Sequence, residues 1–218
     1  EQFGLYYARL PLQKSANIVN DNALRIDWNG VVDRSHLTYI LGNPPFVGSK
    51  LLDDQQRHDM ANIFNEVKNG KILDFVAAWY MLAAKYIQSS SIKCAYVSTN
   101  SITQGEQVGV LWKELIKKYK VKINFAHNTF KWNNEARGKA AVYVVILGFS
   151  LLNKKVKQLF TYDDIKGEPS LVETNNINPY LVPYDDLIIE RRSSPICNVP
   201  EMSFGNMPLD GGLFLLSN

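Results

Sequence analysis

The protein has 218 residues, of which 46% are hydrophobic and 21% are charged, and its formal net charge is +3. This is the composition of an ordinary globular protein, and it argues against disorder and against a coiled coil. The most apolar segments, 74–87 and 140–149, are shorter than the roughly 18 to 20 residues that span a bilayer, so the sequence predicts no contact with a membrane.

The cysteines and histidines point to neither a disulfide framework nor a metal site. Cys94 and Cys197 lie far apart and show no pairing pattern, which favours a reducing cytoplasm. The three histidines, His36, His58 and His127, do not have the spacing of metal ligands. No metal ion is therefore predicted.

The predicted elements alternate between strands and helices. A weak strand at 16–19 precedes a better one at 37–41, which Pro44 and Pro45 must end because proline cannot donate to a sheet. Asp53 or Asp54 can cap a helix that runs to about Val67. The later elements are a buried helix at 74–87, a strand at 93–100, a helix at 104–119 and two strands at 121–130 and 139–149. The helix at 104–119 is amphipathic, with Val108, Leu111, Trp112, Leu115 and Ile116 facing inward.

This order predicts an α/β fold that closes with an antiparallel hairpin, because the segment "KWNNEARG" between the last two strands is too short for a helical crossover. After Ser150 the sequence changes to charged turns and frequent prolines. We therefore predict a first domain at 1–150, and at 151–218 a linker with the start of a second module.

Positive charge is concentrated between Lys113 and Lys157, where eleven basic residues accompany only two acidic ones, Glu114 and Glu135. Lysine clusters usually lie on solvated faces. The block would equally suit a polyanion such as DNA, with Lys117, Lys118 and the lysines at 154–157 contacting phosphates.

The segment "YILGNPPFVGSK" at 39–50 carries the strongest chemical signal. Neither proline has an N–H, so the loop is rigid and rich in acceptors, with the Asn43 amide and the Phe46 ring beside them. In open α/β sheets, ligands bind beyond the carboxyl ends of strands. Two acceptors, the Asn43 side-chain oxygen and the Pro44 carbonyl, could hold the two N–H bonds of a planar amine and direct its lone pair at an electrophile. Phe46 would stack on a base that has left the duplex.

The motif "GNPPF" after a strand resembles that of the class I methyltransferases that modify adenine N6 in DNA. Further segments narrow the resemblance to single-chain bacterial restriction-modification enzymes with a fused target-recognition domain, and it covers nearly the whole chain. These segments are "YYARLPLQKSANIVNDNALRIDW", "LDFVAAWYMLAAKYI", "STNSITQGEQV", "FKWNNEARGKAAVYVVILGF" and "INPYLV…MSFGNMPLDGG".

The resemblance implies a Rossmann-like sheet, S-adenosylmethionine as cofactor, and double-stranded DNA with a flipped adenine as substrate. The resemblance implies functional roles for three groups of residues in this chain. The catalytic loop is Asn43, Pro44, Pro45 and Phe46. The cofactor candidates are Asn22 or its neighbour Asp21, and Asp74, whose alternative role is to cap the buried helix. The substrate-binding candidates are Lys139 and either Trp132 or Phe130, in the loop between the last two strands, as the second aromatic face against the flipped base.

The resemblance also implies that part of the family's fold precedes Glu1. No glycine-rich cofactor loop precedes Asn43, so the chain is expected to be a partial sheet whose first strands are missing, and to be inactive alone. The strand at 37–41 would then have an open edge that favours self-association. Two other functions remain open: a glutamine or RNA-amine methyltransferase with the same loop, and a DNA-binding piece without catalysis.

Overall fold

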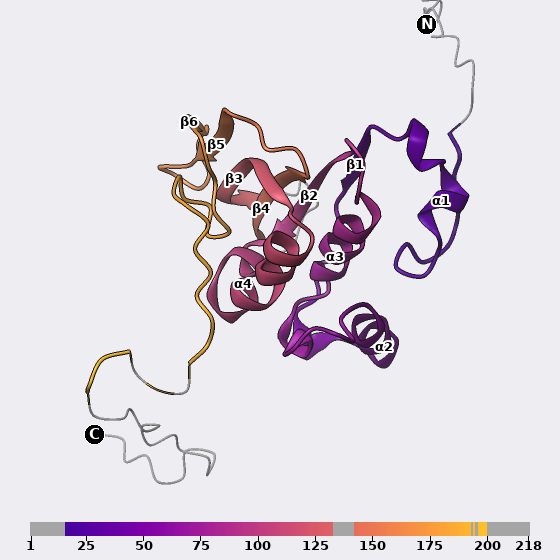
Figure 1. Ribbon diagram of the computed structural model, residues 1–218, viewed down its shortest axis with the longest axis horizontal. Coiled ribbons are helices and arrows are strands. Elements are labelled where there is room, and N and C mark those ends of the chain that lie inside the picture. The colour runs from indigo at the N-terminus through magenta and orange to yellow at the C-terminus, as the bar shows by residue number, and fades with distance from the viewer. Residues whose placement is uncertain (1–15, 133–141, 193, 195, 200–218) are drawn as a thin grey trace, which may run out of the picture.

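The computed structural model describes residues 16–132, 142–192, 194 and 196–199, and these contain a six-stranded sheet flanked by helices (Figure 1). The strand order is β1–β2–β4–β3–β5–β6. The strands are β1 (Tyr39–Gly42), β2 (Lys93–Thr99), β3 (Lys122–Trp132), β4 (Val142–Ser150), β5 (Lys157–Thr161) and β6 (Ser170–Thr174). The α-helices are α1 (Trp28–Val31), α2 (Asp54–Ile63), α3 (Ala77–Tyr86) and α4 (Gly105–Trp112).

Four strands run in the same direction. β1 is parallel to β2, β3 is parallel to β5, and β4 lies antiparallel between β2 and β3. The predicted closing hairpin of β3 and β4 is confirmed. Gly42, Thr99, Trp132 and Thr161 therefore lie at one end of the sheet, which we call the carboxyl end, and the first residues of the same strands lie at the amino end.

Helices α3 and α4 pack on one face of the sheet (Figure 1). Tyr80 of α3 stacks on Phe149 of β4, with ring centroids 5.4 Å apart, and its hydroxyl lies 2.7 Å from Ser98 Oγ on β2. Trp112 of α4 is fully buried and donates from Nε1 to the Ile102 carbonyl at 2.8 Å. The predicted burial of α3, which is apolar nearly all round, is confirmed.

The helix boundaries differ in part from the prediction. Asp53 caps α2 and forms a capping box with Gln56, as the sequence indicated, but the helix ends at Ile63 rather than Val67. The predicted helix at 104–119 divides into α4 and a π-helix over Lys113–Lys118. Within the described parts of the chain, no helix is both long and apolar enough to cross a membrane.

Two strand predictions need correction. Residues 16–19 form no strand, and Ile18 is 85% exposed. The predicted strand at 37–41 is β1, which spans Tyr39–Gly42 and so begins and ends later than predicted. Tyr39 and Leu41 are exposed because they alternate with Ile40, which packs against the core. β1 pairs only with β2 among the described residues.

The sheet continues past the predicted boundary at Ser150. β5 and β6 extend it beyond β3, and Ile177 and Leu181 join the hydrophobic core. The buried Lys157 on β5 donates to Asn176 at 2.8 Å, and Asn176 in turn donates to Asp186 at 3.0 Å. Asp186 also pairs with Lys122 of β3 at 3.1 Å. These contacts tie residues 157–186 to the sheet, so the expected linker is partly a continuation of the first domain.

Candidate active site

The Asn43 loop leaves β1 at the carboxyl end of the sheet. Asn43 and Pro45 are exposed, Phe46 is half-buried, and Pro44 is buried. Glycine at position 42 avoids a tight contact, because a Cβ there would lie 3.1 Å from the ring of Tyr96 on the neighbouring strand. Among the described residues, none hydrogen-bonds the Asn43 side chain or the Pro44 carbonyl. Neither acceptor is therefore engaged by another described residue.

Asp74 fixes the far end of this loop. Its carboxylate accepts from the Ser49 amide at 2.9 Å and from the Ser101 hydroxyl at 2.5 Å. The Phe75 amide next to it donates to the Val47 carbonyl at 2.9 Å. The Asp74 side chain does not cap α3, whose first residues have no side-chain cap, so that alternative is wrong. Asp74 instead joins the Asn43 loop to the segment that follows β2.

A cavity of about 300 Å³ opens beside the Asn43 loop. It is mostly apolar, and the turn at Ala23, helix α1, strand β1, helix α3 and strand β2 all contribute to it. Its lining residues are Ala23, Trp28, Ile40, Leu41, Gly42, Asn43, Pro44, Pro45, Trp79 and Tyr96. The sequence did not point to Trp28, Trp79 and Tyr96, because aromatic residues in or next to a helix or strand are usually part of the core.

The turn at 21–24 is held against this cavity by helix α2. Asp59 is buried, with 4% exposure, and accepts from Arg25 Nε at 2.8 Å and from Asn22 Nδ2 at 3.2 Å. The Trp28 indole donates to the Ala23 carbonyl at 2.8 Å. Asp21 is exposed, and neither it nor Asn22 lines the cavity, which the turn reaches through Ala23. The cofactor role of Asp21 and Asn22 stays a prediction.

The two aromatic candidates lie in β3 itself and not in the loop after it, which corrects the prediction. Phe130 and Trp132 are the last aromatic residues of the strand, with ring centroids 6.1 Å apart. Phe130 is half-buried and Trp132 is 40% exposed. Both are at the carboxyl end of the sheet, as is Asn43. Lys139 lies outside the described residues.

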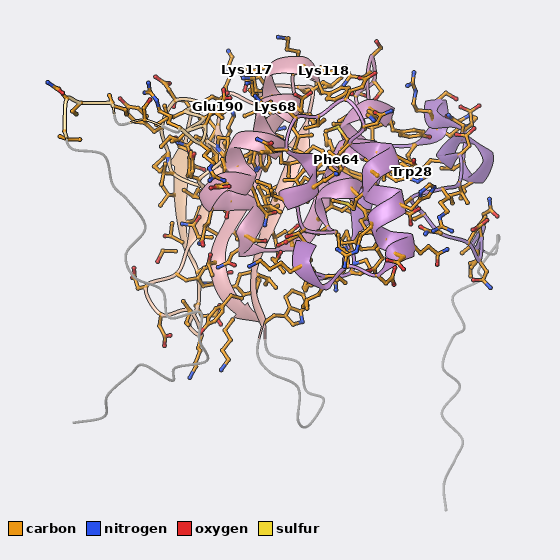
Figure 2. The ribbon with its side chains drawn as sticks, turned by 90° about the horizontal axis from the view of Figure 1, so that it is seen from below. Trp28, Phe64, Lys68, Lys117, Lys118 and Glu190 are labelled. Atoms are coloured by element: carbon orange, nitrogen blue, oxygen red, sulfur yellow. The ribbon has the colours of Figure 1, made fainter. Side chains whose placement is uncertain are left out.

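Most of the basic block lies at the opposite end of the sheet. Lys117 and Lys118 precede β3, and Lys154 and Lys155 precede β5, so these residues are at the amino end. Figure 2 shows Lys117 and Lys118 near Lys68 and Glu190 at the upper margin of the molecule. Three of the lysines form ion pairs, which are Lys113 with Glu190, Lys118 with Glu66 and Lys122 with Asp186. This placement favours the solvated-surface interpretation over the contact with phosphate.

Cys94 is not placed to act as a nucleophile. Both cysteines of the chain are free, and Cys94 is buried on β2. Burial raises the pKa of the Cys94 thiol to about 12, so it stays protonated near neutral pH. In the described part of the chain, no group of three or more His, Cys, Asp or Glu side chains is arranged to hold a metal ion.

The mixed sheet with a proline loop after β1 matches the α/β class that the sequence predicted. Residues 1–161 match the family described as "MmeI, DNA-methyltransferase domain". The chain belongs to this family, because the match covers most of its length.

Two relatives extend this assignment. The chain is 45% identical over 210 residues to DNA methyltransferase A of Bacillus subtilis (strain 168), covering 95% of this chain and 23% of the relative. It is 50% identical to the Type IIL restriction-modification enzyme MmeI in a complex with DNA, with a TM-score of 0.89, covering 96% of this chain and 28% of the MmeI chain. The chain thus spans about a quarter of the length of each relative.

Proposed function

We propose that this chain is the part of a DNA methyltransferase that binds the target base, and that the full-length protein transfers a methyl group to the exocyclic amine of adenine. The observation that carries the proposal is the pair of free acceptors in the rigid Asn43 loop, at the mouth of an apolar cavity. The names of the relatives support a restriction-modification DNA methyltransferase.

The chemistry follows from what the loop can do to an amine. The lone pair of the adenine amine is delocalised into the ring, so the amine is a poor nucleophile. If the Asn43 oxygen and the Pro44 carbonyl accept its two N–H bonds, they favour a tetrahedral nitrogen and stabilise the positive charge that develops on it. Phe46 supplies a face for the base. With the cofactor bound, its methyl group would pass to this nitrogen by direct in-line displacement, without a covalent intermediate on the protein. The bond from the methyl group to sulfur would break, the neutral thioether would leave, and the methylated amine would lose one proton to solvent.

The residues of the cavity fit one end of the proposed cofactor, S-adenosylmethionine. A cavity of about 300 Å³ that is lined by Trp28, Trp79 and Pro45 suits a flat, apolar adenine ring. When bound, the cofactor supplies a methyl group on a positively charged sulfur. The turn at Ala23 and the loop at Pro44 would hold its adenine, and Asp59 keeps that turn in place through Arg25 and Asn22.

The proposed partner is double-stranded DNA with the adenine flipped out of the helix, because a base within the duplex cannot reach the loop. With a DNA substrate and a relative from Bacillus subtilis, the full-length protein would act in the bacterial cytoplasm. The open edge of β1, with Tyr39 and Leu41 exposed, would pair with further strands of the full-length protein or with a second copy. Residues after the sheet would lead into the target-recognition region.

The test uses the full-length protein that contains this chain, radiolabelled S-adenosylmethionine and genomic DNA, with the modified base identified by mass spectrometry. We expect N6-methyladenine from the wild type. Asn43→Ala should reduce kcat at least about 100-fold, which corresponds to about 3 kcal/mol, and leave DNA affinity unchanged. Asn153→Ala, which changes an exposed asparagine at the other end of the sheet, is the matched control. Methylation of protein or RNA instead of DNA, or normal turnover by Asn43→Ala, would contradict the proposal.

A further inference from the structure

We propose that His127 and Tyr162 are positioning residues that hold the ring of Phe130 as the second wall of the pocket for the target base. The inference rests on the proposed function, because it names residues that complete the same site. It concerns four aromatic side chains, which we call the ring cluster: His127 and Phe130 of β3, Phe160 of β5, and Tyr162 directly after β5.

The first argument is a bulge in β3. His127 is opposite Ile146 of β4, and Phe130 is opposite Val144, so three steps along β3 match two steps along β4. In a regular strand, residues three apart point to opposite faces of the sheet. The extra residue restores the same face, and the rings of His127 and Phe130 lie 6.1 Å apart. The bulge therefore turns Phe130 toward His127.

The second argument is the set of contacts within the ring cluster. The rings of His127 and Phe160 are parallel within 7° at 4.2 Å, and those of Phe130 and Tyr162 are within 22° at 5.1 Å. The Tyr162 hydroxyl lies 2.8 Å from His127 Nδ1 and forms a hydrogen bond with it. Tyr162 thus contacts Phe130 with its ring and His127 with its hydroxyl. The Phe130 ring therefore packs near two side chains, His127 and Tyr162, which are hydrogen-bonded to each other.

The third argument is the place of the ring cluster in the sheet. It lies on the face opposite the helical core, because Ala126 next to His127 is buried in that core. Phe130 and the Asn43 loop are both at the carboxyl end. Their strands, β3 and β1, are three strand-to-strand spacings apart across the sheet, because β2 and β4 lie between them. Three strand spacings amount to about 14 Å between backbones. A base stacked between two rings needs about 7 Å of that width, which leaves room for the two side chains.

A purely structural role for the ring cluster makes a different prediction from a positioning role. If the cluster only packs the ends of β3 and β5, truncation of Tyr162 lowers stability and leaves the chemical step of the folded enzyme intact. If Tyr162 positions Phe130, the loss appears in the capture of the flipped base and in kcat. The loss would also depend on the presence of Phe130.

The experiment measures methyl transfer by the full-length protein on a duplex that carries its methylation sequence, identified by sequencing DNA from the expressing host. A second duplex carries 2-aminopurine in place of the target adenine, so that its fluorescence reports the environment of the flipped base. The variants are Tyr162→Ala, Tyr162→Phe, Phe130→Ala and the double variant Tyr162→Ala/Phe130→Ala. Tyr184→Ala, which changes a tyrosine that is 69% exposed, is the control.

We expect Tyr162→Ala to lower kcat about 10- to 100-fold with little change in KM for DNA. The reason is that the Phe130 ring would no longer be held in position against the flipped base. Its 2-aminopurine signal should change as it does in Phe130→Ala. Tyr162→Phe keeps the ring and should retain most of the activity, and it also guards against a folding defect in Tyr162→Ala. The double variant should be no worse than Phe130→Ala alone, because coupled residues are not additive.

Two results would overturn the inference while leaving the proposed function intact. One is a kcat and a 2-aminopurine signal in folded Tyr162→Ala that equal those of the wild type. The other is full additivity with Phe130→Ala. If the wild type itself does not methylate adenine, the proposed function fails first, so the two failures are distinguishable.

Discussion

Replacing Asp74 with alanine removes the carboxylate that holds the end of the Asn43 loop. The Ser49 amide, which donates to Asp74 at 2.9 Å, has no other partner among the described residues. The Ser101 hydroxyl would lose its bond to Asp74 as well, but it retains a contact of 2.8 Å with Thr99 Oγ1. The loss therefore falls mainly on the loop.

Hydrogen bonds to charged groups contribute about 1.5 to 3 kcal/mol each. Because Asp74 is only partly buried and Ser101 keeps one partner, we expect Asp74→Ala to destabilise the closed loop by about 3 kcal/mol. This corresponds to about a 100-fold increase in loop opening. Asp74→Asn should cost much less, since its amide oxygen can still accept from Ser49 and its NH₂ can donate to Ser101.

The measurement is amide hydrogen exchange over residues 43–50 of the full-length protein, together with kcat for methyl transfer. Exchange at Ser49 should rise strongly in Asp74→Ala and modestly in Asp74→Asn, and kcat should fall in the same order. Asp185→Ala, at an exposed carboxylate without a side-chain contact among the described residues, is the control. If both variants lose cofactor affinity equally while loop exchange stays normal, Asp74 contacts the cofactor and the loop-fixing role is wrong.

The remaining predictions concern charge and pH. Lys117→Gln together with Lys118→Gln should leave the salt dependence of DNA binding unchanged, whereas Lys131→Gln, at the carboxyl end, should reduce its slope by about one unit. Burial lowers the pKa of His127, so the fold favours the neutral ring. Stability is therefore fully present above the ordinary pKa of about 6.5 and is lost as the pH falls toward the lower pKa of the folded state. Melting curves between pH 5 and 7 should show this loss in the wild type and not in His127→Gln.

The sequence predicted the elements whose pattern is local. The apolar run of α3, the capping box at Asp53 and the hairpin of β3 and β4 each follow from residues close together in the chain. The Asn43 loop followed from the two prolines. Each of these features depends on backbone rules that operate over a few residues, which explains why the structure confirms them.

The features that the sequence did not predict depend on distant partners. The exposure of Tyr39 and Leu41 depends on which face of β1 the core covers, which its apolar residues do not reveal. β5 carries a buried lysine, Lys157, which is accommodated by Asn176 and the nearby carboxylate of Asp186, both from a later turn. Tyr162 lies in a charged turn after β5 and becomes interpretable only beside His127.

The bulge between His127 and Phe130 carries a cost that core packing does not explain. Asn128 Oδ1 is buried there without a hydrogen-bond partner among the described residues, and an unsatisfied buried oxygen destabilises a fold by about 1 to 3 kcal/mol. A regular strand would avoid this cost but would turn Phe130 to the other face of the sheet. Local departures from regular structure that cost stability are concentrated at functional sites. The bulge places Phe130 on the same face of the sheet as His127. The cost at Asn128 therefore accompanies the position of Phe130 in the pocket proposed for the target base.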